Sequence, residues 1–291
     1  LNRASQGLYP PGSTFKVVTA AAALESGVYE PGSTFTDPGY CTVYGRRVNN
    51  FDTSSPFGTV SLATALQFSV NSVFCNIGLK LGARRVLKQA KELGFYERPP
   101  LETPEGERRP SGLYKLEKRN LRLYDPRRDA DVDAGRMAFG QERLLVTPLQ
   151  MAMVAGAVGN GGILMKPFVV ERIVTPNGKT RSRTAPERIR RAMSPVTARD
   201  VGAMMVRAVQ AGTGTAAQLS GFRVGGKTGT AETGVARQNV TWFIAFAGRD
   251  GERPEVAVAV VLENQSSTGG ATAAPIARQV MQALLVQTAN P

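Results

Sequence analysis

The chain has 291 residues, 42% hydrophobic and 20% charged, which is enough for one large or two moderate domains with a buried core. Its 36 basic and 23 acidic residues give a net charge of +13, but no run of five like charges occurs, which disfavours a nucleic-acid-binding tract. The absence of histidine and the presence of only two cysteines exclude a cysteine-rich metal site and disfavour a zinc site.

No run of eighteen consecutive apolar residues occurs, so the sequence predicts no membrane-spanning helix. Cys41 and Cys75 are compatible with one disulfide in an oxidising compartment and equally with two thiols.

The first predicted element is a stiff loop that runs into an apolar helix. Residues 10–12, Pro-Pro-Gly, resist helix formation, residues 17–24 are mainly strong helix formers, and residues 26–27, Ser-Gly, form a stop signal. Ser13 therefore falls on the first helical turn. Residues three apart share a helix face, so the Lys16 amine is predicted to lie beside the Ser13 hydroxyl.

This Ser-x-x-Lys pattern could support nucleophilic catalysis. A serine hydroxyl needs a base, and in a chain without histidine a desolvated lysine with a lowered pKa can be that base. The free N–H groups of the helix N-terminus could hold an oxyanion. The simpler alternative is a serine near an N-cap, followed one turn later by a solvated lysine.

The middle of the chain is predicted to be mostly helical. Residues 28–50 form a loop or hairpin with strand-like pieces at 33–36 and 42–48, and residues 99–128 form a long loop or a set of short elements. The polar break at 68–72 can present side chains into a cleft. Helices are predicted at residues 61–67, 72–82, 84–93 and 147–158.

The last third is predicted to be a sheet with helices around it. Residues 168–174 and a strand after Asn177-Gly178 form a hairpin, and a capping box from Thr197 to Asp200 begins a helix over 199–211. A final helix over 273–285 should pack on the sheet. The antiparallel strands of the sheet are predicted at residues 222–230, 240–247 and 255–262.

Three motifs stand in one order along the chain. They are Ser13-x-x-Lys16, Ser69-x-Asn71 and Lys227-Thr228-Gly229-Thr230. This trio, with a serine and an asparagine in the middle motif, is typical of penicillin-binding proteins and class A β-lactamases.

The third motif has a physical rationale. Glycines at 225, 226 and 229 remove side chains from a strand, so that an extended peptide can approach and pair with its backbone. Lys227 supplies positive charge, and the hydroxyls of Thr228 and Thr230 can hold a carboxylate. The N–H groups of Thr230 and Ser13 would form a two-donor oxyanion hole.

Over essentially its whole length the chain resembles the transpeptidase domain of class B penicillin-binding proteins, the monofunctional D,D-transpeptidases. Residues 138–141, 146–152 and 241–243 extend the resemblance beyond the three motifs. It implies an α+β fold, an antiparallel sheet flanked by helices beside an all-α lobe. The single domain would span 1–291, with the lobe at 28–158 inserted between sheet parts at 1–27 and 163–291.

The resemblance also implies a role for each motif residue. Ser13 would be the acylated nucleophile, Lys16 its general base, and Ser69 the proton relay to the leaving D-alanine. Asn71 would hydrogen-bond the donor peptide. The terminal carboxylate would be bound by the strand that carries Lys227, Thr228, Gly229 and Thr230.

The implied partners are peptidoglycan stem peptides, β-lactam antibiotics and a membrane glycan polymerase, with no cofactor, metal or nucleic acid. The implied location is the extracytoplasmic face of the bacterial cytoplasmic membrane. In this family an N-terminal anchor, a pedestal domain and two sheet strands precede the nucleophile helix, and these would lie outside the chain.

Two alternatives remain open at this point. A class D-like serine β-lactamase or β-lactam sensor shares the Ser-Thr-Phe-Lys and Lys-Thr-Gly patterns, but that group usually has an apolar residue at the position of Asn71. A non-catalytic cell-wall scaffold would require the three motifs to be misassembled.

Overall fold

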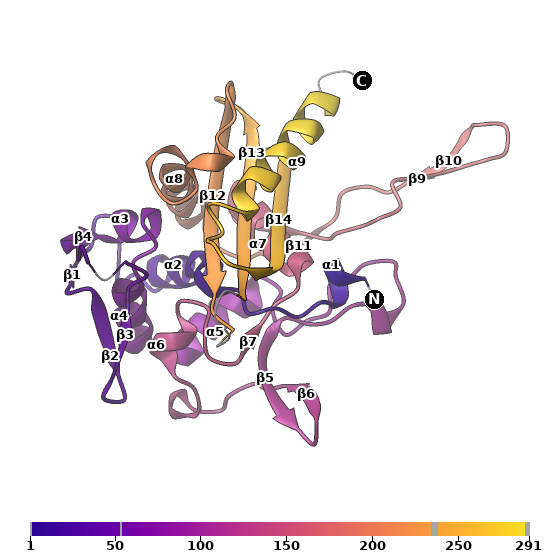
Figure 1. Cartoon of the computed structure of the whole chain (residues 1–291). Coiled ribbons are helices and arrows are strands. Elements are labelled where there is room, and N and C mark those ends of the chain that lie inside the picture. The colour runs from indigo at the N-terminus through magenta and orange to yellow at the C-terminus, as the bar shows by residue number, and fades with distance from the viewer. Residues whose placement is uncertain (1, 53, 234–237, 289–291) are drawn as a thin grey trace.

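The computed structural model describes residues 2–52, 54–233 and 238–288 (Figure 1). The helices are α1 (Arg3–Gln6), α2 (Lys16–Glu25), α3 (Leu62–Gln67), α4 (Asn71–Leu81), α5 (Ala83–Glu92), α6 (Ala134–Met137), α7 (Pro148–Gly159), α8 (Pro195–Ala211) and α9 (Ala273–Thr288). Short 3-10 turns are η1 (Gly12–Phe15), η2 (Glu105–Glu107), η3 (Asp129–Asp131) and η4 (Thr215–Ala217). The strands are β1 (Thr34–Asp37), β2 (Tyr40–Val43), β3 (Arg46–Asn49), β4 (Gly58–Ser61), β5 (Gly112–Glu117), β6 (Asn120–Leu123), β7 (Leu144–Leu145), β8 (Ile163–Met165), β9 (Arg172–Val174), β10 (Thr180–Arg183), β11 (Arg188–Arg191), β12 (Phe222–Ala231), β13 (Asn239–Arg249) and β14 (Val256–Gln265).

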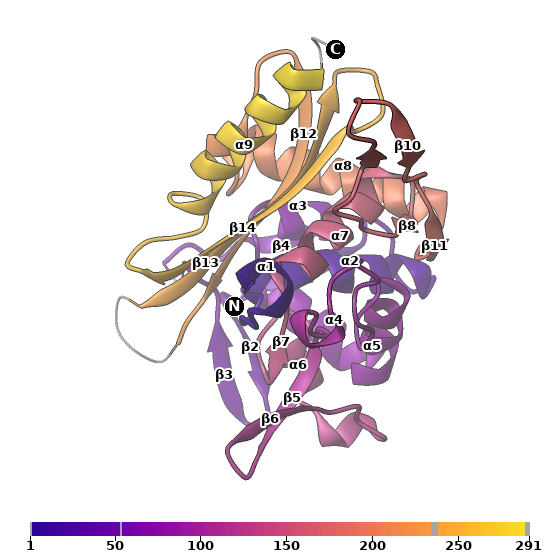
Figure 2. The same cartoon turned by 90° about the vertical axis from the view of Figure 1, so that its right-hand side faces the viewer.

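The long sheet has the strand order β12-β13-β14, and both strand pairs are antiparallel, as predicted. β13 is buried on both faces, so its side chains divide between two cores. Trp242, Ile244 and Phe246 belong to the main core, whereas Phe243 and Ala245 belong to a second core under α9. Figure 2 shows α9 along one face of the sheet and α7 and α8 toward the other, which confirms that the last helix packs on the sheet.

The N-terminal segment is fixed on the sheet directly before α2. Trp242 Nε1 donates to Pro10 O at 2.9 Å, and the Trp242 ring meets the Tyr9 ring edge-on, with the centroids 6.1 Å apart. η1 then passes without a break into α2, whose alanine-rich sequence has high helix propensity. α2 is therefore a buried helix with its N-terminal end held against β12.

The prediction of an all-α lobe at residues 28–158 is wrong in one respect. α3 to α7 are present there, but short antiparallel strands lie among them: β1 pairs with β4, β2 with β3, and β5 with both β6 and β7. The strand-like piece predicted at 42–48 is two strands, because Tyr44 and Gly45 adopt positive φ angles of 48° and 74° and form a hairpin turn.

Two predicted N-caps are confirmed and the predicted start of α8 is wrong. Ser61 and Thr147 cap α3 and α7 as expected, each accepting a hydrogen bond from a backbone N–H three residues later. α8, however, begins at Pro195 and is capped by Ser194, whose hydroxyl accepts from Thr197 N. A serine followed by proline at the first helical position is the stronger start signal, and it lies three residues before the predicted capping box.

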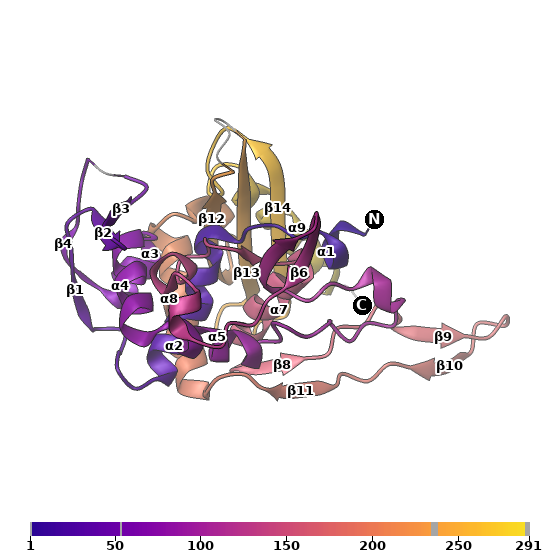
Figure 3. The ribbon, with the colours of Figure 1, turned by 90° about the horizontal axis from the view of Figure 1, so that it is seen from below.

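The predicted hairpin at β9 and β10 is confirmed and belongs to a longer arm. β8 pairs with β11 nearer the body, and β9 pairs with β10 farther out. Figure 3 shows the two pairs as one continuous projection away from the sheet.

No helix within the described ranges is long and apolar enough to cross a bilayer.

Candidate active site

One cleft of about 740 Å³ is lined by members of all three motifs. Its walls come from η1, the α3–α4 junction, the β2–β3 hairpin and the end of β12. The predicted site residues that line it are Ser13, Ser69, Asn71, Thr228 and Thr230. Segments far apart in the sequence therefore meet at one surface, as the motifs predicted.

The half-buried Ser13 lies on η1 beside the end of β12. The preceding Gly12 has a φ of 52°, and a Cβ added there would come within 3.0 Å of Thr230 O. Gly12 N also donates to Gly140 O at 3.1 Å. Glycine is therefore required by both conformation and space, and this close approach sets Ser13 next to Thr230.

Lys16 is completely buried behind the cleft, and its amine joins the first motif to the second. Nζ lies 2.7 Å from Ser69 O, 3.2 Å from Ser69 Oγ and 2.7 Å from Asn71 Oδ1. Burial, together with the positive charge of Lys227, holds the Lys16 pKa well below its usual value.

Among the described residues, the hydrogen bonds of Lys16 Nζ go to the second motif and none is formed with Ser13. The position of the amine beside the Ser13 hydroxyl stays a prediction. Ser13 lies on the 3-10 turn η1 and Lys16 begins α2, and the acceptors of the buried amine come from the α3–α4 junction.

Ser69 and Asn71 are presented by the junction of α3 and α4. Ser69 has a φ of 61°, an uncommon conformation for a residue with a side chain, and Asn71 begins α4. Asn71 Nδ2 donates to Asn49 O at 3.0 Å, which connects the junction to the β2–β3 hairpin. Asn71 thus binds the Lys16 amine through Oδ1 and the β2–β3 hairpin through Nδ2.

Asp37 stabilises the contact between the β2–β3 hairpin and α4, although no motif predicted this role. Its carboxylate accepts hydrogen bonds from Gly39 N, Asn50 Nδ2, Phe57 N and Ser72 Oγ. Burial acts to raise the pKa of this carboxyl, but these hydrogen bonds together hold it below its usual value. The charged carboxylate therefore ties the hairpin to the first turn of α4.

Lys227 is buried in β12, and burial lowers its pKa to about 7. Its Nζ donates to Thr228 O at 3.0 Å. Thr228 Oγ1 lies 2.7 Å from Thr213 Oγ1, and Thr230 Oγ1 accepts from Gly269 N at 3.2 Å. The two threonine hydroxyls are therefore held in place while facing the cleft.

The glycines of β12 were predicted to make room for an extended peptide, and this reason is wrong. A Cβ at Gly225 or Gly226 would lie 2.3 Å from the Phe246 ring or 2.4 Å from the Phe243 ring. At Gly229 it would lie 2.9 Å from both Pro11 O and Thr14 Cγ2. The glycines thus make room for the protein's own rings and for η1, and Gly229 packs under the cleft rather than lining it.

Sequence reasoning missed several cleft residues. Thr213, after α8, belongs to none of the three motifs, yet it contacts Thr228. No local pattern marks it, since its role depends on where the end of α8 meets β12. Other lining residues outside the motifs are Arg47, Asn49, Phe68, Arg136, Gln141 and Glu232.

The described cysteines are joined, with Cys41 and Cys75 sulfurs 2.10 Å apart. The bond links β2 to α4, so it fastens the hairpin wall of the cleft to the helix that carries Asn71. Among the described residues, no group of three acidic, cysteine or histidine side chains could hold a metal ion.

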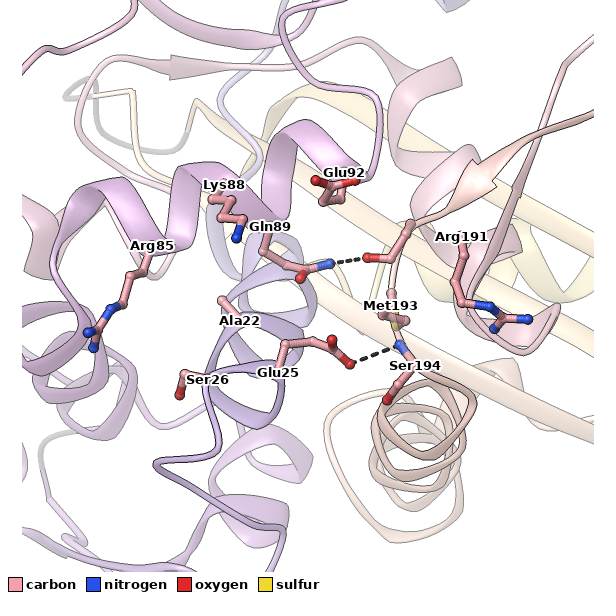
Figure 4. A pocket seen from close by; sticks show the side chains of 11 residues that line it. Ala22, Glu25, Ser26, Arg85, Lys88, Gln89, Glu92, Arg191, Met193 and Ser194 are labelled. Carbon is pink, nitrogen blue, oxygen red and sulfur yellow. Dashed lines mark hydrogen bonds between the residues drawn. The ribbon is translucent and has the colours of Figure 1, made fainter.

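A second cavity, of about 600 Å³, lies between the C-terminal end of α2, α5 and the segment entering α8 (Figure 4). Gln89 Nε2 donates to Ala192 O at 2.7 Å, and Ser194 N donates to Glu25 Oε1 at 2.9 Å. These bonds tie the three elements together. No motif residue lines this cavity, so the chemistry belongs to the cleft.

Comparison with known proteins agrees with this geometry. The chain matches the penicillin binding protein transpeptidase domain over residues 1–282. The peptidoglycan D,D-transpeptidase PbpA of Mycolicibacterium smegmatis is 37% identical across 98% of this chain and 57% of that protein. Stage V sporulation protein D of Bacillus subtilis is 32% identical across 94% of this chain and 42% of that protein. The chain spans about half the length of these curated relatives.

Solved structures give the same result. A ceftriaxone acyl-enzyme complex of penicillin-binding protein A from Mycobacterium tuberculosis has a TM-score of 0.83 and 34% identity, and covers 97% of this chain and 62% of that chain. The D,D-transpeptidase domain of a peptidoglycan glycosyltransferase from Eggerthella lenta has a TM-score of 0.79 and 31% identity. The match covers 99% of this chain and 68% of that chain. With its three motifs gathered in one cleft and its mixed α and β fold shared with these structures, the chain belongs to the penicillin-binding protein transpeptidase family.

Proposed function

We propose that the chain is the catalytic domain of a D,D-transpeptidase that cross-links peptidoglycan stem peptides through an acyl-Ser13 intermediate. The observation that carries this proposal is the buried Lys16 amine, which contacts Ser69 and Asn71 directly behind the cleft that Ser13 lines. The relatives named D,D-transpeptidases and the related β-lactam acyl-enzyme complexes support it.

In the acylation step, Ser13 Oγ attacks the carbonyl carbon of the penultimate D-alanine. A neutral Lys16 amine takes the hydroxyl proton, and the lowered pKa of Lys16 increases the neutral fraction of the amine. The hydroxyl of Ser69, 3.2 Å from Lys16 Nζ, passes a proton to the leaving amine of the terminal D-alanine. Catalytic hydrogen bonds are often long before substrate binds, so the bond from Ser13 to Lys16 is proposed to form in the substrate complex.

In the second step an amine from a neighbouring stem peptide attacks the acyl-enzyme. The new amide bond forms as the ester to Ser13 breaks, and the proton lost by the amine returns to Ser13 Oγ through the same lysine. The backbone N–H groups of Ser13 and Thr230 are the proposed oxyanion donors, and the close packing of Gly12 on Thr230 O supports their proximity.

The terminal carboxylate of the donor is assigned to Thr228 and Thr230, with Lys227 behind them. Both hydroxyls face the cleft, and Thr213 holds the first of them at 2.7 Å. Thr230 Oγ1 accepts from Gly269 N, and a hydroxyl that accepts from a neighbour keeps its own proton for a carboxylate. Asn71 is assigned to the donor peptide backbone.

One contact disfavours a class D-like β-lactamase or sensor. Lys16 Nζ donates to the polar side chain of Asn71 at 2.7 Å, whereas that group usually places an apolar residue there. The assembled cleft counts against a non-catalytic scaffold.

The proposed location is the extracytoplasmic face of the bacterial cytoplasmic membrane, with an anchor preceding these residues in the parent protein. The Cys41–Cys75 bond supports an oxidising compartment. A membrane glycan polymerase is the proposed protein partner, and β-lactams are proposed inhibitors that acylate Ser13.

The test is intact-protein mass spectrometry over time after mixing with benzylpenicillin, with Ser13→Ala in parallel. A stable adduct on the parent alone supports a transpeptidase with slow deacylation. An adduct that disappears while the drug is hydrolysed supports the β-lactamase alternative. No adduct would contradict both enzymatic functions.

A further inference from the structure

The outer arm, residues 168–188, has no core of its own. Within residues 168–183, Thr175 is half-buried and the other residues are exposed. β9 and β10 form a two-stranded sheet, which Figure 3 shows projecting away from the body of the protein. A ribbon of two strands that buries no side chains is only marginally stable in water. The outer arm is therefore expected to lie against a partner.

Exposed aliphatic side chains lie on both faces of this ribbon. Val169 is 65% exposed, Ile173 is 51% exposed and Val174 is 50% exposed. Ile173 and Val174 follow each other in β9, and adjacent residues of a strand point to opposite faces. A partner that covers one face would therefore leave an aliphatic side chain of the other face in water.

The outer arm also carries positive charge that the protein does not neutralise. Its two carboxylates are paired, since Glu171 Oε1 lies 2.7 Å from Arg183 Nη2 and Glu187 Oε2 lies 2.7 Å from Lys166 Nζ. The cations of the outer arm that form no ion pair within the described ranges are Arg172, Lys179, Arg181 and Arg188. A partner of the arm must therefore offer both apolar surface and negative charge.

The interface of an anionic bilayer offers both on every side of the ribbon. The apolar stems of arginine and lysine lie along the acyl chains while their charged ends stay among the headgroups, and anionic phospholipids attract these ends. A folded acidic protein that packs on one face would leave either Ile173 or Val174 in water. Deeper insertion is excluded by the free edges of the ribbon, because backbone N–H and C=O groups find no partner in hydrocarbon.

We propose that the outer arm lies in the headgroup region of a bilayer that contains anionic phospholipids. Val169, Ile173 and Val174 reach the boundary of the acyl chains, and the four unpaired cations bind lipid phosphates. This contact restricts how the active-site cleft is oriented relative to the membrane. It agrees with the proposed location and does not depend on the chemistry of Ser13.

Co-sedimentation of the chain with vesicles measures the binding. Vesicles of an equimolar mixture of phosphatidylglycerol and phosphatidylcholine should bind the protein, and vesicles of phosphatidylcholine alone should not. High salt should weaken the binding, because it screens the attraction between the arm and the lipid phosphates. The arm variant combines Arg172→Gln, Lys179→Gln and Arg181→Gln. It should bind about a hundredfold more weakly, since each cation near an anionic surface contributes about a fivefold change in affinity.

A matched control removes three exposed arginines from the body of the protein. These side chains lie on α8, β12 and α9 and form no ion pair within the described part of the chain. The control has the same net charge as the arm variant, and it should bind vesicles nearly as well as the parent because screening limits the reach of charges that do not touch the surface. Its substitutions are Arg207→Gln, Arg223→Gln and Arg278→Gln.

Tryptophan probes test whether both faces of the ribbon meet lipid. The chain has one tryptophan, Trp242, which is completely buried, so its emission should not respond to vesicles. Ile173→Trp and Val174→Trp place one probe on each face of β9. On the anionic vesicles, both probes should show blue-shifted emission and quenching by brominated lipid.

No binding of the parent to the anionic vesicles would overturn the proposal. An equal loss of binding in the arm variant and the control would overturn it as well, because net charge alone would then explain the attraction. A response of only one tryptophan probe would indicate a one-sided contact, as with an acidic protein, and would contradict the bilayer location. Acylation of Ser13 by penicillin tests the proposed function separately from all of these results.

Discussion

Lys16 Nζ lies 2.7 Å from Asn71 Oδ1, so the base proposed for the reaction is held by the motif that the sequence places 55 residues away. Because the asparagine is neutral, it orients the amine and favours its protonated form less than a carboxylate would. This distinguishes it from a carboxylate, which would raise the pKa of the lysine.

Asn71→Asp should therefore slow acylation at neutral pH and make it recover at alkaline pH. A carboxylate beside Lys16 raises the amine pKa, and each unit of increase lowers the neutral fraction about tenfold at a pH below that pKa. The measurement is the second-order rate of acylation by penicillin between pH 6 and 10. A loss of rate that is uniform across this range would indicate a structural defect and contradict the explanation.

Lys227→Met should flatten the pH dependence of stability. The folded protein releases the Lys227 proton near pH 7, whereas an unfolded lysine keeps it to about 10.5. The unfolded state thus binds more protons in this window, so the free energy of unfolding of the parent rises with pH by up to about 1.4 kcal/mol per unit relative to the variant.

Urea unfolding of both proteins at pH 7, 8 and 9 measures this difference. If the free energies of unfolding of the parent and the variant change equally with pH, Lys227 keeps its proton in the folded state. That result would contradict the lowered pKa of Lys227.

Thr213→Val should weaken recognition of the donor carboxylate. The variant removes the hydroxyl 2.7 Å from Thr228 Oγ1 while keeping the side-chain shape. A hydrogen bond that supports binding of a charged group contributes about 1.5–3 kcal/mol, so we expect KM for acyl-D-alanyl-D-alanine peptides to rise about tenfold with little change in kcat. Thr213→Ser keeps the hydroxyl and is the matched control, so an equal defect in the serine variant would argue against a role for the hydrogen bond.

Asp37→Asn should destabilise the hairpin wall and the first turn of α4. The amide cannot accept from all of Gly39, Asn50, Phe57 and Ser72, so we expect a loss of about 2 kcal/mol in the free energy of unfolding. The folded-state pKa of Asp37 is below its usual value, so the contribution is present at neutral pH and is lost as pH falls through that lowered pKa.

Asp52→Asn changes an exposed carboxylate in the loop that follows the same hairpin and is the control for charge. The measurement is the free energy of unfolding from chemical denaturation at pH 7 and pH 3. At pH 7, Asp37→Asn should be less stable than Asp52→Asn. At pH 3, the stability of Asp37→Asn should be closer to that of the parent. Equal stability of parent and Asp37→Asn at pH 7 would contradict the supporting role of this carboxylate.

The sequence by itself determined the elements whose signals are local. Caps at Ser61 and Thr147, the alanine-rich run of α2, and the apolar strands β12 to β14 each depend on neighbouring residues, and these predictions were confirmed. The three motifs, through their resemblance to those of penicillin-binding proteins, also indicated that Ser13, Ser69, Asn71, Thr228 and Thr230 belong to one site, and these residues line one cleft.

Tertiary structure decided what depends on contacts between distant segments. The Lys16 amine binds Ser69 and Asn71, and these acceptors come from the junction of α3 and α4. Gly229 packs on η1 because that turn crosses β12 at this position. The bonds of Asp37 to Ser72 and of Thr213 to Thr228 have no local signal, since these partners lie 35 and 15 residues away in the chain. Hydrogen-bond partners at long sequence separation are set by packing, and packing is the property that residue patterns in one chain do not encode locally.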